Sequence, residues 1–146
     1  MGLRSLEQER AKFAYDCVSE VRRSGEETQK RYVSYVKSAP ALILTNGLGQ
    51  ALAFYLSKMG NGGELEHSAI NPEVFEEGEK RAYAFLYSHI TGWLAEKMTG
   101  GKDPLKVYME GDSMTAIAIT EEALALLNWL KRFGDAMLKK DKNGEG

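Results

Sequence analysis

The sequence predicts an all-α protein, folded as one compact bundle of about five to seven helices. The strong helix formers Ala, Leu, Met, Glu, Gln, Lys and Arg supply 75 of the 146 residues, whereas the β-branched Val, Ile and Thr supply 17. Propensity is a weak guide at one position but an informative one when it is summed over a chain. In addition, no stretch alternates apolar and polar residues for long enough to predict an exposed strand.

Length and charge bound the domain organisation and the class of partner. We expect one bundle domain over residues 1–138 and a flexible charged tail over residues 139–146. Hydrophobic residues make up 43% of the chain, which is enough for a single core, and the formal net charge is −2. That balance argues against a globally basic nucleic-acid binder but leaves room for a local basic patch.

Cysteine usage and hydropathy indicate the compartment. Cys17 is the only cysteine, so the chain has neither a disulfide framework nor a thiolate zinc cage, and this fits a reducing cytoplasm. No apolar run approaches the roughly 20 residues that a membrane helix requires. The first residues contain no apolar core of an export signal. We therefore expect a cytoplasmic protein that does not contact a membrane.

The first helix is expected from about Ser5 to about Ser24-Gly25. Ser5 is a candidate N-cap because Gln8 follows it at the spacing of a capping box. Helical periodicity places Arg10 at the centre of an apolar stripe, between Leu6 and Phe13. A guanidinium in that position keeps its charge, so it requires a partner carboxylate or several carbonyl groups.

The next helix is expected over Glu26 to Ala39. Pro40 is expected to end it and to open a third helix from Ala41 to Met59, since proline fits the first turn of a helix but not its interior. The third segment is apolar nearly all round, which is typical of a buried central helix. Three further helical regions are expected: one from Asn71-Pro72 to about Thr99, broken near Gly78; a short one after Asp103-Pro104 that ends near Gly111; and a last one after Thr120.

One motif points to nucleotide binding. The apolar run Ala41 to Thr45 followed by Gly47-x-Gly49 is similar to a dinucleotide-binding turn, in which glycines let the backbone approach a pyrophosphate. This interpretation requires a strand over Ala41 to Thr45. The favoured alternative is a buried helix with small residues for close packing, because Pro40 fits a helix start and no βαβ unit follows.

No catalytic or metal site is expected. Gly111-Asp112-Ser113 superficially matches the block of one esterase class, but that chemistry needs an oriented histidine base. The two histidines are His67, in a polar loop, and His89, on a predicted helix flank, so Asp112-Ser113 is better interpreted as a helix N-cap. The histidine spacing does not form a helical ligand pair, so we expect neither a metal nor a cofactor.

Basic doublets on the predicted helices or at their ends are the remaining candidate feature. Lysine and arginine commonly solvate helix surfaces, and the sharper hypothesis is that some of these residues converge on a stripe that contacts phosphates. Trp129 lies at the edge of its apolar face and is the one candidate exposed aromatic contact. The doublets are Arg22-Arg23, Lys30-Arg31, Lys131-Arg132 and Lys139-Lys140.

Four blocks carry a family resemblance. They are Arg4 to Tyr15 (RSLEQERAKFAY), Tyr32 to Lys37 with Pro40, Asn46 to Phe54 (NGLGQALAF), and Thr120 to Phe133, which contains LNWLKRF. In this order they resemble the small helical subunit of the Cmr complex, the RNA-targeting effector of type III-B CRISPR systems, built around the RAMP module. The blocks lie at both ends and in the middle, so the resemblance covers most of the chain.

The resemblance implies a compact helical bundle with no catalytic activity of its own. Members of the family stack on one another, beside the other Cmr subunits, and flank the duplex of CRISPR RNA and target RNA through backbone contacts. A helical adaptor that never meets RNA is the alternative, since the sequence pI is about 5.8. On the RNA-binding hypothesis, the expected contacts are the outward basic residues of the first two helices and the last one: Arg22, Arg23, Lys30, Lys37, Lys131, Arg132 and Lys139.

Overall fold

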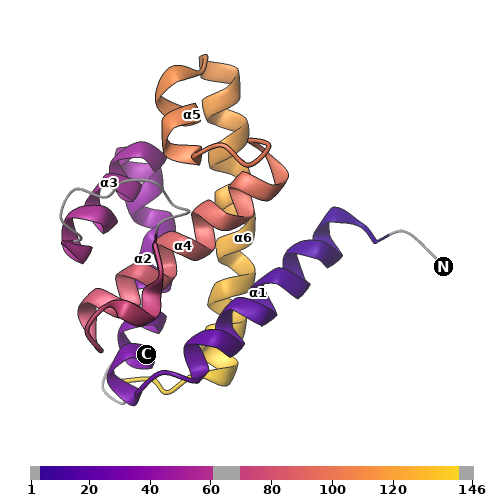
Figure 1. The fold of residues 1–146 in the computed structure, drawn as a ribbon. Coiled ribbons are helices and arrows are strands. Elements are labelled where there is room, and N and C mark those ends of the chain that lie inside the picture. Colours follow the sequence, from indigo (N-terminus) through magenta and orange to yellow (C-terminus); the bar gives the residue numbers. More distant parts are fainter. Residues whose placement is uncertain (1–3, 61–69, 142–146) are drawn as a thin grey trace.

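Helices make up the regular structure of the residues that the computed structural model describes, which are 4–60 and 70–141, and no β-strand occurs in these ranges. The expectation of an all-α bundle is confirmed (Figure 1). The elements are α1 (Leu6–Arg22), α2 (Glu26–Asn46), α3 (Leu48–Met59), the short 3-10 helix η2 (Pro72–Val74), α4 (Glu79–Lys97), α5 (Pro104–Glu110) and α6 (Ser113–Met137). None of the described helices is long and apolar enough to cross a membrane.

Helix α4 is the centre of the bundle. It contacts each of the other elements, and its side chains are buried almost continuously from Ala82 to Ala95. The expectation that the segment from Ala41 to Met59 is the buried central helix is wrong. That segment divides between α2 and α3, and it leaves Leu44 and Phe54 exposed at 73% and 40%. The number of apolar residues in a helix indicates how much of its surface should be buried. Which helix lies at the centre depends on how the helices pack against one another.

The expected helix boundary at Pro40 is also wrong, because α2 runs through Pro40 to Asn46. Proline removes one backbone donor from the helix ladder, but it does not by itself end a helix whose other residues are packed. Ala39 and Ile43, on either side of Pro40, are both buried in the core. The break falls instead at Gly47, whose φ of 92° and ψ of 155° are accessible essentially to glycine alone.

Two helix starts agree with the capping residues in the sequence, in contrast to the boundary expected at Pro40. Ser5 and Gln8 form the predicted capping box, in which each side chain binds the backbone N–H of the other residue. Asp112 caps α6 by accepting a hydrogen bond from the N–H of Thr115 at 2.9 Å, which confirms Asp112-Ser113 as a helix start. The expected start of the last helix after Thr120 is therefore too late by two turns.

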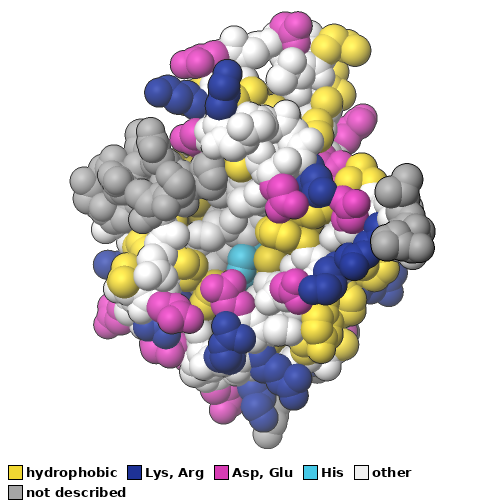
Figure 2. Space-filling model, turned by 45° about the vertical axis from the view of Figure 1, so that its right-hand side comes forward, with side chains coloured by type: hydrophobic (Ala, Val, Ile, Leu, Met, Phe, Trp, Pro, Cys, Tyr) yellow, Lys and Arg dark blue, Asp and Glu magenta, His cyan; other side chains and the backbone are white. Residues whose placement is uncertain are grey.

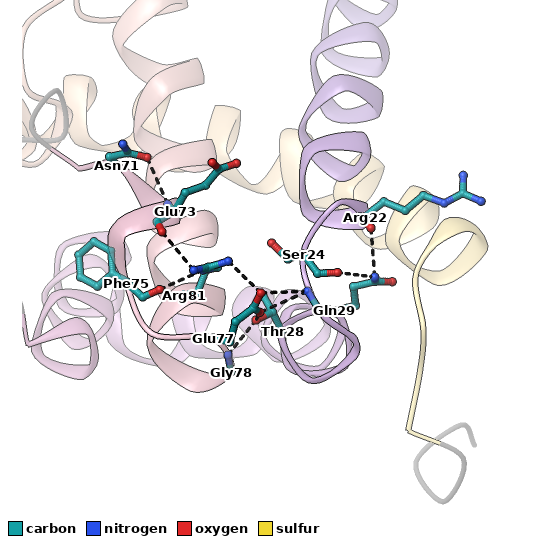
Figure 3. Close-up of polar contacts among 11 residues, drawn as sticks. Arg22, Ser24, Thr28, Gln29, Asn71, Glu73, Phe75, Glu77, Gly78 and Arg81 are labelled. Carbon is teal, nitrogen blue, oxygen red and sulfur yellow. Dashed lines mark hydrogen bonds and ion pairs between the residues drawn. The ribbon is translucent and has the colours of Figure 1, made fainter.

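The expected break near Gly78 is confirmed, and it is tied to the start of α2 (Figure 3). Glu77 accepts hydrogen bonds from the N–H of Gly25, at 3.2 Å, and from the hydroxyl of Thr28. The Thr28 hydroxyl oxygen in turn accepts from the N–H of Gly78 at 2.8 Å. Arg81 donates to Glu77 at 2.9 Å. The acidic composition of residues 76–79 indicates a solvent-exposed stretch. The Glu77 carboxylate nevertheless links the start of α2 to the start of α4.

Arg10 has the carboxylate partner that its position requires. Its guanidinium meets Glu122 of α6 through two bonds, from Nε at 2.5 Å and from Nη2 at 2.9 Å. The indole N–H of Trp93 on α4 donates to the same carboxylate at 2.8 Å. The side chain of Glu122 is 8% exposed, and the Arg10 hydrogen bond is the main reason that its pKa lies below the usual range. One buried ion pair thus joins α1, α4 and α6.

Candidate nucleic-acid interface

The seven predicted RNA-contact residues lie on the surface of the bundle. Six are exposed and Lys30 is half-buried; the six are Arg22, Arg23, Lys37, Lys131, Arg132 and Lys139. Figure 2 shows Lys and Arg side chains gathered at the lower end of one face, the end where α1 and α6 finish in Figure 1. Lys30 and Lys37 line a groove on α2, Arg22 and Arg23 lie at the end of α1, Lys131 and Arg132 lie on α6, and Lys139 follows α6.

The groove runs along the outer face of α2 and has a volume of about 630 Å³. Lys30, Ser34 and Lys37 line it because these positions recur on one side of a helix, while Tyr32 and Val36 face the core. The segment after α6 also contributes to the lining. The full set of lining residues is Glu27, Lys30, Arg31, Val33, Ser34, Tyr35, Lys37, Ser38, Lys140 and Asp141.

Gln29 holds the segment after α6 beside α2. Its side-chain carbonyl accepts a hydrogen bond from the N–H of Lys139 at 3.0 Å. Its amide nitrogen donates to the backbone carbonyls of Arg22, at 3.1 Å, and Ser24, at 2.9 Å. This buried amide therefore fixes where the chain leaves α6, and it brings Lys140 to the groove. Of the predicted tail, residues 142–146 lie outside the described residues.

Carboxylates accompany the cations of the groove. Lys30 pairs with Glu26 at 3.1 Å, and this hydrogen bond is the main reason that the pKa of Lys30 is raised. Asp135 on α6 is shared by Lys37, at 3.5 Å, and Lys140, at 3.3 Å. The hydrogen bond from Lys140 is the largest cause that holds the pKa of Asp135 below its usual range. A phosphate entering the groove would therefore compete with carboxylates that are already in place.

The remaining predicted cations are differently placed. Arg22 and Arg23 end α1, and Lys131 and Arg132 lie on the outer side of α6. Among the residues that the structure describes, no carboxylate forms an ion pair with any of these four. The charge of Arg23 nevertheless helps to lower the pKa of Glu20, so Arg22, Lys131 and Arg132 are the cations available to a ligand. Lys131 lies one turn before Asp135 on the same side of α6, which places it beside the groove.

Residues 6–137 of the chain match the model of a family whose description is CRISPR-associated protein (Cas_Cmr5). The chain belongs to the Cmr5 family. It is also similar to a solved structure, the X-ray crystal structure of a CRISPR-associated Cmr5 family protein from Thermus thermophilus. The two chains are 25% identical and superpose with a TM-score of 0.63, over 92% of this chain and 99% of that one.

Two basic residues of the groove in this Cmr5-family chain were not among the predicted contacts. Arg31 and Lys140 belong to doublets that the sequence analysis singled out, but only Lys30 and Lys139 were kept from those doublets. Helical periodicity places Arg31 to one side of α2, and Lys140 follows the last helix, where periodicity gives no direction. The signal for Lys140 is Gln29, a buried polar side chain on α2 whose partner is remote in sequence.

The nucleotide-binding alternative is contradicted by the fold. The segment from Ala41 to Thr45 is helical, whereas a dinucleotide-binding turn requires a strand there. The glycines serve close packing: a Cβ at Gly49 would lie 2.7 Å from Cε2 of Tyr108, on α5. The backbone that would face a pyrophosphate is covered by an aromatic side chain.

His89 has no free ring nitrogen to act as a general base. His89 is buried in α4, where Nδ1 lies 2.8 Å from the Tyr32 hydroxyl and Nε2 lies 3.1 Å from Glu20. Both ring nitrogens are therefore occupied, and burial lowers the pKa of His89 despite the neighbouring carboxylate. His67 lies outside the described residues. Within the described ranges, no three metal-ligating side chains come together.

Proposed function

We propose that this chain is a non-catalytic structural subunit of an RNA-guided, RNA-targeting Cmr effector complex. Family membership carries this proposal, since it implies association with other Cmr subunits. In the complex, the subunit stacks with further copies of itself and flanks the duplex of CRISPR RNA and target RNA. The non-catalytic part of the proposal is supported by His89, whose two ring nitrogens are engaged by Tyr32 and Glu20 and are therefore not free to act on a substrate.

We infer that the duplex of CRISPR RNA and target RNA is contacted through its phosphates rather than through its bases. The supporting observation is the arrangement of cations: Lys30 and Lys37 line one groove, and Arg132 lies on α6 without a described carboxylate partner. Phosphate contacts position a protein on a duplex and carry no sequence information. RNA binding by this surface is therefore expected to depend little on sequence and strongly on salt.

A salt titration of the assembled complex tests this proposal. We expect Lys30→Glu, Lys37→Glu and Arg132→Glu to weaken target-RNA binding, and each lost phosphate contact to reduce the logarithmic salt slope by about 0.7–0.9. Incorporation of the variant subunit is checked first. Lys102→Glu and Lys106→Glu, at exposed positions around the start of α5, are the matched controls and should leave the slope unchanged.

The alternative is a helical adaptor that docks on protein subunits without meeting RNA. The carboxylates of Glu26 and Asp135 favour it, because they neutralise the groove lysines at short range. The same titration separates the two hypotheses. Equal slopes and affinities for wild-type and charge-reversed complexes would show that the subunit is a spacer held by protein contacts.

A further inference from the structure

Three aromatic side chains meet at the surface seam between α1 and α6. The ring of Phe133 stacks on that of Trp129, with centroids 5.7 Å apart and an interplanar angle of 27°. Tyr15 of α1 meets Phe133 edge to face, at 5.6 Å and 82°. Tyr15 is 49% exposed, and the other two rings are half-buried. We name Tyr15, Trp129 and Phe133 the aromatic ridge.

The inner rings of the ridge, Trp129 and Phe133, pack against the core, and a surface hydrogen bond orients one of them. The indole N–H of Trp129 donates to Glu7 of α1 at 3.1 Å, which holds the ring in one orientation across the seam. Tyr32, Tyr55 and Tyr87, by contrast, are almost fully buried. About half of the Tyr15 surface is covered by the fold, and the other half is open to a ligand.

Cations without carboxylate partners flank the ridge. Arg22 lies seven residues after Tyr15 on the same side of α1, and Arg132 lies three residues after Trp129 on α6. Neither forms an ion pair with a described carboxylate. Two acidic residues of α1 are engaged elsewhere, since Glu7 meets Arg10 at 2.9 Å and Asp16 meets Lys12 at 2.8 Å. Figure 2 shows an apolar patch at the lower right of one face with Lys and Arg side chains beside it.

We propose that the aromatic ridge is a stacking platform for unpaired bases of single-stranded RNA, with Arg22 and Arg132 on the adjoining phosphates. Aromatic rings beside uncompensated cations are the combination that binds single strands, because every base has a face that stacks. This inference rests on the proposed function, and it adds single-stranded RNA to the guide–target duplex as a ligand of the subunit. A duplex presents its backbone, whereas only an unpaired base can lie on Tyr15.

Tryptophan fluorescence reports on this site directly. Trp93 is 1% exposed, so a quencher that reaches tryptophan from solvent acts on Trp129. The experiment titrates the 146-residue chain with a 12-nucleotide single-stranded RNA of mixed sequence and with the corresponding 12-base-pair duplex. We expect the single strand to quench the fluorescence and to bind more tightly than the duplex.

Substitutions at Tyr15 separate stacking from apolar docking. Tyr15→Leu keeps apolar surface but removes the ring, and we expect it to weaken single-strand binding about 10-fold. Tyr15→Phe keeps the ring and should bind like the wild type. Phe54→Leu, which changes an exposed ring on α3, is the matched control and should have no effect. Melting temperatures establish that each variant is folded.

Several outcomes would overturn the proposal. Absence of quenching, equal affinity for duplex and single strand, or unchanged binding by Tyr15→Leu would each do so. If Tyr15→Leu binds RNA normally but fails to enter the Cmr complex, the ridge is a protein interface. The phosphate-contact hypothesis fails separately: it is lost if reversal at Lys30 and Lys37 leaves the salt slope unchanged, whatever Tyr15 does.

Discussion

At the scale of single residues, Arg10 shows how a charge inside an apolar stripe organises its surroundings. Its side chain is 16% exposed, and its two bonds to Glu122 form the fork that guanidinium and carboxylate groups prefer. Removing one partner of such a pair leaves the other charge buried and without a partner. The pair is therefore needed for stability once either member is present.

We expect Arg10→Ala to lower the free energy of unfolding by roughly 3–5 kcal/mol, because Glu122 would lose its main partner. Lys12→Ala is the matched control on the same helix. Lys12 pairs with Asp16 at the surface, where both side chains are 59% exposed, so its loss should cost less than about 1 kcal/mol. Thermal or denaturant unfolding of the two variants measures both values, and an unchanged melting temperature for Arg10→Ala would contradict the structural role.

At the scale of elements, one glycine is required to end a helix, whereas another lies in a helix interior where a side chain would fit. Gly47 divides α2 from α3 with a positive φ of 92°, a conformation that an L side chain avoids. Gly92 lies inside α4, where an added Cβ would meet only Phe13, at an ordinary contact distance of 3.9 Å. The first glycine is required by the backbone, and the second is replaceable.

Alanine substitution at these two positions should therefore have effects of opposite sign. We expect Gly47→Ala to reduce the free energy of unfolding by about 1–3 kcal/mol through backbone strain. Gly92→Ala should raise it by about 0.5–1 kcal/mol, since alanine favours a helix interior. Denaturant unfolding of both variants provides the measurement. A stable Gly47→Ala protein would mean that the α2–α3 junction adopts another conformation.

At the scale of the whole molecule, His89 joins three helices through one imidazole. From α4 it meets Tyr32 on α2 and Glu20 on α1. A neutral ring that accepts from the Tyr32 hydroxyl at Nδ1 and donates to Glu20 from Nε2 satisfies both contacts. Burial lowers the pKa of His89, and the hydrogen bond to His89 lowers the pKa of Glu20.

These directions predict that acid destabilises the bundle in two stages. A group whose pKa is lower in the folded than in the unfolded protein stabilises the fold fully at pH values above its unfolded pKa. This contribution is lost as the pH falls to the pKa of the folded state. Stability should thus fall as the pH drops below about 6.5 for His89 and further below about 4.5 for Glu20, Glu77 and Glu122. Unfolding curves measured from pH 7 to pH 4 test this.

His89→Gln supplies the control for the first stage. It removes the titrating ring, so the dependence of stability on pH between 7 and 5 should flatten, while the decline below about 4.5 should persist. If wild type and His89→Gln show the same slope over the upper range, His89 does not determine the acid response.

Much of the fold is predictable because its signals are local. The capping box at Ser5, the cap at Asp112 and the proline after Asp103 each act within one helical turn, and each marks a helix start in the structure. The partner of Arg10 could be predicted as a carboxylate, because a buried guanidinium requires one. That the partner is Glu122 could not, since 112 residues separate the two.

The sequence by itself determined the helical class, the helix caps at Ser5, Asp103 and Asp112, the need to neutralise Arg10 and the resemblance to the family that the chain joins. Only the tertiary structure decided that α2 continues through Pro40, that α4 is the central helix, and that Gln29 brings Lys140 to the groove. The physical reason is the range of the interactions. Caps and periodicity act between residues a few positions apart, whereas burial and charge pairing depend on which helices lie side by side.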